Sequence, residues 1–193
     1  MEGWWAASYI VLWLVVAALC AVVVALARQI GTLHLRLGPR GALEMDDEGP
    51  PLGEAPQLVA ARAAATGESV SLGGPGRARL LLFASPGCMV CEQVLPGLGA
   101  LGRRAGMAAF VVSQLDVEEA NASFTGVGGR TPVLAAPDAF LSWSIPGTPY
   151  VVVLDESGSV RAKGTPNNLE QMEGLVDSAR RRMAGVGLRE SAR

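Results

Sequence analysis

The sequence has few of the residues that build metal centres and nucleic-acid interfaces. Its 193 residues contain three cysteines, one histidine and one lysine, Lys163, and the formal net charge is -2. Zinc usually takes four cysteine or histidine ligands, and a chain with His34 beside an apolar N-terminal segment and no second cysteine pair cannot supply them. No basic stretch carries interleaved aromatic side chains, so nucleic acid is not a predicted partner.

Two of the three cysteines lie close together at the start of a predicted helix. Residues 79–84 form a short apolar run between turn residues, which predicts a buried strand. Apolar side chains then recur at helical spacing: Val90, Val94, Leu98 and Leu101. This junction of strand and helix places Cys88 at the helix N-terminus and Cys91 nearly one turn further along.

This placement predicts thiol chemistry. Unpaired backbone amides and the positive end of the helix dipole favour a thiolate at Cys88, which is therefore the predicted nucleophile. Cys91 can attack a mixed disulfide formed on Cys88 and release the bound molecule, as a resolving thiol does. The alternatives are a half zinc site, a static disulfide and two small core residues. No metal and no cofactor other than the redox-active Cys88–Cys91 disulfide is predicted.

The N-terminus carries a long uncharged segment. No charged residue occurs between Gly3 and Ala27, and two tryptophans and a tyrosine stand near its start, which is typical of a single-pass transmembrane helix. A small-x-small triplet at its end resembles a signal-peptide cleavage site, but the apolar region is longer than in signal peptides. We expect residues 1–30 to form a membrane anchor and residues 31–56, with acidic residues and a proline pair, to form a juxtamembrane segment and linker.

The rest of the chain predicts one α/β domain over residues 57–185 and a disordered tail over residues 186–193. Its expected elements are a hairpin at 58–72, the strand at 79–84, the cysteine helix, a strand at 108–112, an irregular segment at 121–130, a further strand at 131–135, a short helical turn at 138–142, a hairpin at 150–163 and a helix at 167–183. A proline at this position suits an edge strand, the first residue of a strand or a cis peptide, and Thr148–Pro149 is the candidate cis bond.

The order of these elements and two of the prolines resemble the thioredoxin fold, a central mixed sheet flanked by helices. Pro96 stands eight residues after Cys88, as a helix-kinking proline does in thioredoxins. The run from Trp143 to Pro149 resembles the motif that carries the family's cis-proline. The resemblance implies that Pro149 lies against the cysteine pair and that Thr148 and Pro149 bind substrate.

One position departs from the thioredoxin pattern. Leu82 stands where thioredoxins carry a buried acid, so the usual proton acceptor for Cys91 is missing.

Three further stretches are similar to the TlpA/MauD-like branch of membrane-anchored thiol-disulfide oxidoreductases: residues 28–39, 53–56 and 85–91. The strongest similarity is to the MauD family of methylamine-utilisation accessory proteins. It implies an extracytoplasmic domain, a protein thiol or disulfide client such as the disulfide-rich small subunit of methylamine dehydrogenase, and a polytopic MauE-like redox partner. Three arginines follow the span closely, so the positive-inside rule alone would favour a cytoplasmic domain.

The leading hypothesis is thus a membrane-anchored thiol-disulfide oxidoreductase that forms, shuffles or reduces disulfides in an extracytoplasmic client. A TlpA-like thiol reductase acting in cytochrome c maturation is the second enzymatic hypothesis. The non-enzymatic alternative is a module that handles Cu(I) through the two thiolates, since soft thiolate ligands select that ion.

Overall fold

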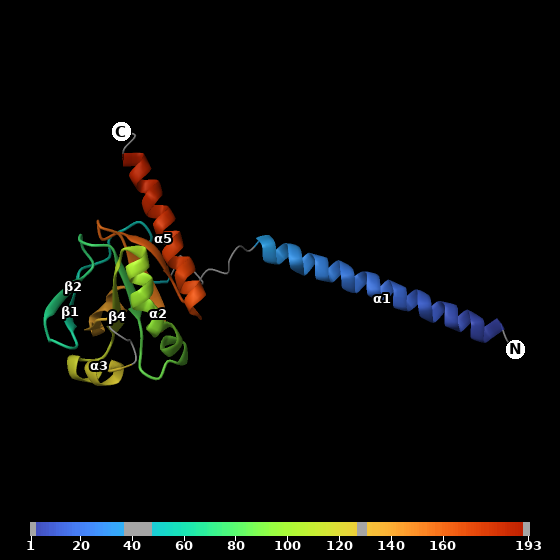
Figure 1. Ribbon diagram of the computed structural model, residues 1–193, viewed down its shortest axis with the longest axis horizontal. Coiled ribbons are helices and arrows are strands. Elements are labelled where there is room, and N and C mark those ends of the chain that lie inside the picture. The colour runs from blue at the N-terminus through green and yellow to red at the C-terminus, as the bar shows by residue number, and fades with distance from the viewer. Residues whose placement is uncertain (1–2, 37–47, 127–130, 191–193) are drawn as a thin grey trace. The chain divides into compact units, whose positions relative to one another are not determined.

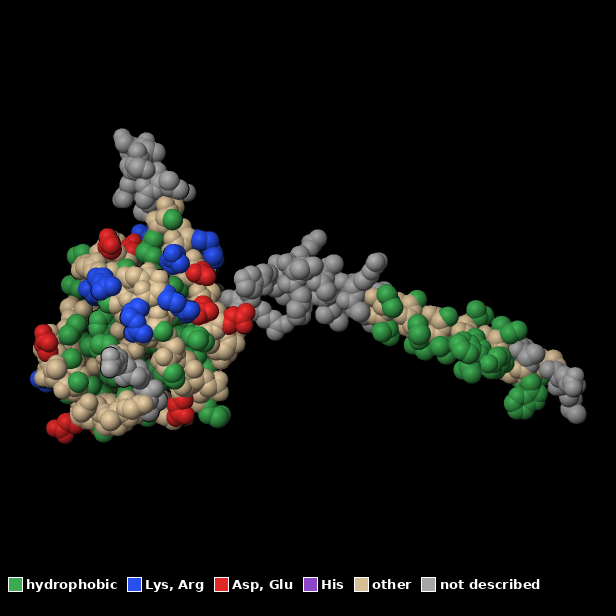
Figure 2. Space-filling view, in the orientation of Figure 1, with side chains coloured by type: hydrophobic (Ala, Val, Ile, Leu, Met, Phe, Trp, Pro, Cys, Tyr) green, Lys and Arg blue, Asp and Glu red, His purple; other side chains and the backbone are tan. Residues whose placement is uncertain are grey.

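The computed structural model describes residues 3–36, 48–126 and 131–190, which belong to two units, Met1–Arg40 and Gly41–Arg193 (Figure 1). The first unit holds the helix α1 (Gly3–Arg36). Its part Gly3–Val24 has a mean hydropathy of 2.7 and is long and apolar enough to cross a membrane. Large apolar side chains are exposed along this part of the helix (Figure 2), which fits the expected single-pass anchor.

The second unit is an α/β domain with seven strands and four helices among the described residues. In chain order these are β1 (Val59–Ala63), β2 (Ser69–Leu72), β3 (Arg79–Phe83), α2 (Met89–Ala105), β4 (Ala108–Ser113), α3 (Val117–Phe124), β5 (Val133–Ala135), α4 (Pro137–Ser142), β6 (Tyr150–Leu154), β7 (Val160–Gly164) and α5 (Leu169–Glu190).

The strands form one mixed sheet in the order β2-β1-β5-β4-β3-β6-β7. Strand β3 lies inside the sheet, parallel to β4 on one side and antiparallel to β6 on the other, so the helix α2 makes the crossover of a β-α-β unit. The two hairpins β1–β2 and β6–β7 form in the ranges where the sequence predicts them. The thioredoxin-like fold expected from the sequence is confirmed.

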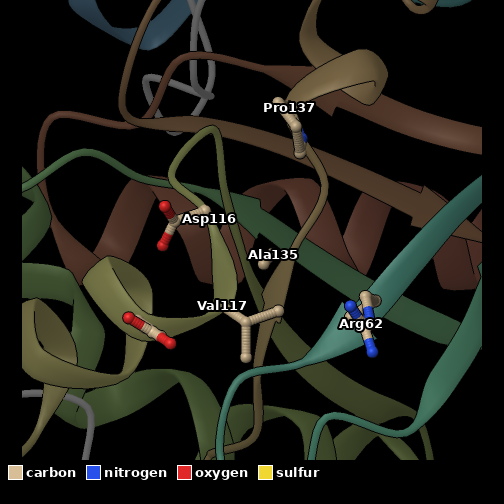
Figure 3. A pocket seen from close by; sticks show the side chains of 6 residues that line it. Arg62, Asp116, Val117, Ala135 and Pro137 are labelled. Atoms are coloured by element: carbon tan, nitrogen blue, oxygen red, sulfur yellow. The ribbon is translucent and has the colours of Figure 1, made fainter.

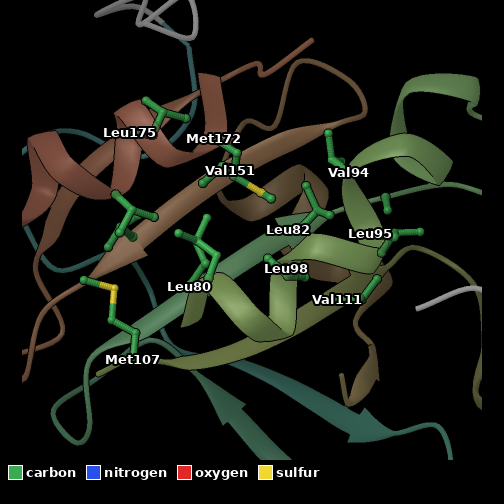
Figure 4. Packing of buried hydrophobic residues seen from close by; sticks show 14 of the residues in the cluster. Leu80, Leu82, Val94, Leu95, Leu98, Met107, Val111, Val151, Met172 and Leu175 are labelled. Carbon is green, nitrogen blue, oxygen red and sulfur yellow. The ribbon is translucent and has the colours of Figure 1, made fainter. Parts of the chain in front are cut away.

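One face of the sheet, here called the α2 face, is covered by α2, α3 and α5 with an apolar cluster between them (Figure 4). From the strands this cluster takes Leu80, Leu82, Val111, Val151 and Val153, all 0% exposed. From the helices it takes chiefly Val94, Leu95, Leu98, Met172, Leu175 and Val176. Three of the four residues of the stripe predicted for α2, Val94, Leu98 and Leu101, are buried in this cluster and fix the helix on the sheet despite its three glycines, whereas Val90 is only half-buried and outside the cluster.

The opposite face, here called the α4 face, has a second cluster built from the alternate strand residues. Phe83, Tyr150 and Val152 point to this side, and α4 adds Ala139 at its centre, with Trp143 directly after the helix. The Phe83 ring lies 5.1 Å from Phe140 and 5.9 Å from Trp143, centroid to centroid. These contacts hold α4 against the middle of the sheet.

The predicted linker is partly wrong. Residues 48–57, here called the 48–57 segment, pack on the α4 face instead of remaining solvated: Pro50 is buried, and Gly53 and Glu54 exchange backbone hydrogen bonds with Val160, at 2.8 and 2.9 Å. The acidic residues and prolines predicted a solvated chain. The contacts are made by backbone groups, which every residue carries, so they cannot be predicted from the amino-acid composition. Residues 37–47 lie outside the described residues.

Two other boundaries differ from the prediction. Helix α3 forms where the irregular segment was expected to begin, because Asp116 caps it by accepting a hydrogen bond from the Glu119 N–H at 2.9 Å. Helix α5 continues to Glu190, so residues 186–190 are helical and not part of a disordered tail. Extending an existing helix by one turn is much cheaper than starting one. Residues 191–193 lie outside the described part of the chain.

Candidate active site at the N-terminus of helix α2

Cys88 and Cys91 form a disulfide at the start of α2, just after the loop that follows β3. Their Cα atoms are 5.2 Å apart. Cys88 is the N-cap residue, with an extended backbone, and its Sγ accepts a hydrogen bond from the Cys91 N–H at 3.2 Å. One of the unpaired amides of the helix N-terminus is therefore directed at the Cys88 sulfur, as the sequence predicts.

The two cysteines differ in exposure. Cys88 is half-buried and stands beside Met89, whose side chain is 77% exposed, whereas Cys91 is only 1% exposed and belongs to the α2-face cluster. A molecule approaching from solvent therefore meets Cys88 first. Cys91, which is buried, is much less accessible to such a molecule.

The surroundings of Cys91 are apolar. Leu82, at the position of the expected buried acid, is 0% exposed and lies in the same cluster as Cys91. Within the residues that the structure describes, the only buried polar or charged side chains are Ser113 and Lys163. Lys163 alternates with Ala162 along β7 and pairs with Val152, which places it on the α4 face, away from Cys91.

The candidate cis bond is present: the Thr148–Pro149 peptide is cis. It ends the loop of residues 144–149, here called the cis-proline loop, which leads from α4 into β6. Pro149 is buried and Thr148 is half-buried. The Thr148 hydroxyl donates to the Ser85 hydroxyl at 3.1 Å, which ties the cis-proline loop to the β3–α2 loop three residues before Cys88.

A groove of about 450 Å³ opens beside these two loops. Among the residues that the structure describes, its lining carries no charged side chain and consists of Ser85, Gln114, Pro137, Phe140, Leu141, Ile145, Pro146, Gly147 and Thr148. Leu141 on its rim is 88% exposed. A hollow with an exposed leucine on its rim, lined by Ser85 three residues before Cys88, can take the apolar side chain of a bound peptide.

A second cavity, of about 500 Å³, lies between β1, β5 and α3 (Figure 3). It is lined by Arg62, Asp116, Val117, Glu118, Ala135 and Pro137. Neither a cysteine nor a residue of the cis-proline loop lines it, so it is not part of the cysteine site. In the described ranges, no group of three or more histidine, cysteine or acidic side chains is placed to hold a metal ion.

Sequence reasoning identified Cys88, Cys91, Thr148 and Pro149, and the fold brings the two loops that carry them together through the Ser85–Thr148 hydrogen bond. It missed Ser85 as a link between the loops and missed the groove. No local signal marks them, because Ser85, Gln114 and Ile145 become neighbours only when β3, β4 and the cis-proline loop assemble.

A Cys-x-x-Cys disulfide at a helix N-terminus, on a thioredoxin-like fold with a cis-proline before β6, defines the chain as a thiol-disulfide oxidoreductase. No family model matches the sequence. The chain is 32% identical to the methylamine utilization protein MauD of Paracoccus denitrificans over 196 residues, which covers 96% of this chain and 94% of the relative. It is 30% identical to that of Methylorubrum extorquens over 185 residues, covering 93% and 89%. The chain therefore belongs to the MauD family.

Solved structures show the same fold. A putative protein disulfide isomerase from Bacteroides thetaiotaomicron superposes with a TM-score of 0.56 at 19% identity, over 67% of this chain and 89% of that chain. The structure of MTB dsbF in mixed oxidized and reduced forms gives 0.52 at 18% identity, over 64% and 93%.

Proposed function

We propose that the chain is a single-pass membrane protein whose extracytoplasmic domain exchanges the Cys88–Cys91 disulfide with thiols of a protein client. The observation that carries the proposal is the division between the two sulfurs, since Cys88 is half-buried at the helix N-terminus and Cys91 is 1% exposed behind it. This arrangement gives one cysteine to the client and keeps the other for resolution.

The exchange follows from this arrangement. A client thiolate attacks the Cys88 sulfur, the Cys88–Cys91 bond breaks, and Cys91 leaves as a thiolate that takes up a proton. A second client thiolate then attacks the client sulfur of the mixed disulfide, and Cys88 leaves as a thiolate. The client gains a disulfide and loses two electrons, which reduce the cysteine pair. The reverse sequence reduces a client disulfide.

Thr148 and Pro149 bind the client chain beside Cys88 in this proposal. Thr148 precedes β6, so its backbone lies beyond the last ladder pair, Phe83 with Tyr150, where an extended client segment can approach. The uncharged groove then receives a side chain next to the client cysteine. We expect clients that present an apolar residue there to react fastest.

Membership in the MauD family favours a client in methylamine utilisation. We propose the disulfide-rich small subunit of methylamine dehydrogenase as that client and a polytopic MauE-like membrane protein as the redox partner. An extracytoplasmic domain is part of the same proposal, since a large domain that follows a membrane span can be translocated despite a few flanking arginines.

Trapping tests the exchange directly. In membranes that contain the full-length Cys91→Ser variant, the Cys88 thiolate attacks a client disulfide, as in the reverse sequence, and with no Cys91 to resolve the adduct the client should remain attached to Cys88 as a mixed disulfide that dithiothreitol releases. The Cys88→Ser variant is the matched control and should trap far less, and a Cys20→Ser background removes the third cysteine. If the Cys91→Ser variant carries no adducts, the assignment is wrong.

The orientation and direction need separate measurements. After mild reduction of intact cells, a membrane-impermeant thiol reagent should modify Cys88, and protection until lysis would contradict the extracytoplasmic domain. An oxidising role predicts a reduction potential well above that of thioredoxin, about -270 mV, and a value near thioredoxin's would support a reductant instead.

A further inference from the structure

The only lysine of the chain is buried and bound to the segment that leads to the membrane anchor. Lys163 on β7 is 0% exposed, and its Nζ donates to the Glu48 carbonyl oxygen at 2.6 Å. The Tyr150 hydroxyl donates to the same oxygen at 2.9 Å. A buried ammonium group is costly unless it is hydrogen-bonded, so this carbonyl stabilises the lysine, and the lysine in turn fixes the position of Glu48.

Gly49 continues the contact toward the cis-proline loop. Its N–H donates to the Ser144 carbonyl at 3.1 Å. It has φ of +69°, a conformation that side chains rarely adopt, and a Cβ at this position would overlap the Tyr150 hydroxyl and ring. Only glycine lets the backbone pass this close to Tyr150.

These contacts bracket the cis-proline loop. Ser144 is its first residue, and Tyr150 directly follows its last residue, Pro149. Two consecutive residues, Glu48 and Gly49, therefore bond to the side chain of the residue that follows the loop and to the backbone of the loop's first residue, and this loop contributes Ile145 to Thr148 to the groove.

We infer that Glu48, Gly49, Tyr150 and Lys163 form a clamp by which the 48–57 segment positions the cis-proline loop for client binding, with Lys163 as a positioning residue. The inference rests on the proposed function for its substrate, a protein or peptide thiol. A small thiol reaches Cys88 without using the loop, so the clamp acts on reaction with peptides and not on the chemistry of the disulfide.

The experiment compares two glycine variants of the full-length protein in detergent micelles. Gly49→Ala adds a methyl group that collides with Tyr150. Gly53→Ala is the matched control, because Gly53 also has a positive φ, +81°, in the same segment, but a Cβ there meets nothing within 4 Å. The probes are a synthetic dithiol peptide with leucine next to its first cysteine and, separately, dithiothreitol. Stopped-flow measurement gives the rate constant for reduction of the Cys88–Cys91 disulfide by each.

We expect Gly49→Ala to lower the peptide rate constant about tenfold, since small misplacements of a binding group cost that much or more. The rate constant with dithiothreitol and the reduction potential should stay at the wild-type values, and Gly53→Ala should match wild type with both probes. Lys163→Met, which removes the donor but keeps an apolar stem, should also slow the peptide selectively.

Lysine labelling reports the clamp independently of turnover. An amine-reactive N-hydroxysuccinimide ester can modify only Lys163 and the terminal amine, which peptide mapping separates. Labelling of Lys163 should be slow in wild type and Gly53→Ala and faster in Gly49→Ala.

Three results would overturn the inference: a wild-type peptide rate in Gly49→Ala, whether or not Lys163 becomes labelled; an equal loss in Gly49→Ala and Gly53→Ala; or an equal loss with peptide and dithiothreitol. The Cys91→Ser trapping experiment is independent of these measurements. If it captures a client while Gly49→Ala reacts with the peptide like wild type, the clamp is wrong and the oxidoreductase assignment stands.

Discussion

The two faces of the sheet bury similar apolar strands but are covered by different means. On the α2 face, three helices close over an apolar cluster that includes Cys91, and no charged side chain is buried there among the described residues. On the α4 face, the cover is the short helix α4 and the 48–57 segment, held by polar contacts from Tyr150, Lys163 and Trp143.

This difference in cover matches a difference in what each face holds in place. The apolar face holds the helix that carries the cysteines, and burial of apolar surface is strong but not directional. The polar face holds the loop that meets the client, and hydrogen bonds fix direction at a smaller gain in stability. Changes on the α2 face should therefore act mainly on stability, and changes on the α4 face mainly on how the 48–57 segment and the cis-proline loop are placed.

The largest effect is expected from Leu98→Ala on the α2 face. Leu98 is 0% exposed between α2 and the sheet, and loss of its side chain should lower the free energy of unfolding by about 3 kcal/mol. Urea unfolding of the full-length protein in detergent, followed by tryptophan fluorescence, measures it. Leu141→Ala, at a position 88% exposed, is the control and should leave stability unchanged. Equal losses at the two positions would contradict the role of the α2-face cluster.

An intermediate effect is expected from Trp143→Phe on the α4 face. The Trp143 Nε1–H donates to the Gln57 carbonyl at 2.8 Å, and the ring is 2% exposed. The substitution should cost about 2 kcal/mol through the lost hydrogen bond and the smaller ring. It should also release the 48–57 segment, so limited proteolysis should cut there faster than in Leu98→Ala. If the 48–57 segment were cut faster in Leu98→Ala than in Trp143→Phe, the proposed difference between the two faces would be contradicted.

The smallest effect is expected at Asp155, in the turn between β6 and β7 at the end remote from Pro149. Burial would raise the pKa of Asp155, but hydrogen bonds from Ser157, Arg161 and Ser159 and the charge of Arg161 together lower it below its ordinary value of 3.8. A lowered pKa in the folded state means that the carboxylate stabilises the fold at neutral pH and that this contribution is lost as the pH falls through the folded-state pKa.

Asp155→Asn should therefore lower the free energy of unfolding by about 1 kcal/mol at neutral pH. The difference from wild type should shrink below about pH 4. Denaturant titrations at several pH values measure this, and reaction with the dithiol peptide should be unchanged. If the difference in free energy of unfolding between Asp155→Asn and wild type grew as the pH falls, the lowered pKa of Asp155 would be contradicted.

The sequence predicted the α2 face better than the α4 face. The stripe Val90, Val94, Leu98 and Leu101 and the continuous apolar strands follow short-range periodicity, and these periods determine which side chains face a core. The cysteine site follows from the same local reasoning, since Cys88 lies at a junction of strand and helix. Pro149 suits a sheet edge, a strand start or a cis peptide, so the sequence named Thr148–Pro149 only as a candidate, and the structure shows that the bond is cis.

The 48–57 segment could not be predicted in this way. Its contacts join Glu48 to Lys163 and Gly49 to Ser144, residues about a hundred positions apart, and on the side of the segment they use backbone groups that every residue carries. Lys163 stood out only as the sole lysine, and nothing in its neighbourhood on the chain indicated that it is buried. Such contacts depend on the assembled sheet.

The most direct test of the division between the two sulfurs is the rate at which each one is alkylated. Full-length Cys20→Ser protein is reduced, freed of reductant and treated with limiting iodoacetamide at pH 7, and the modified cysteine is identified by mass spectrometry. A half-buried Cys88 at the helix N-terminus and a buried Cys91 predict that Cys88 reacts about tenfold faster or more. Equal rates, or faster alkylation of Cys91, would contradict the assignment of Cys88 as the thiol that meets the client.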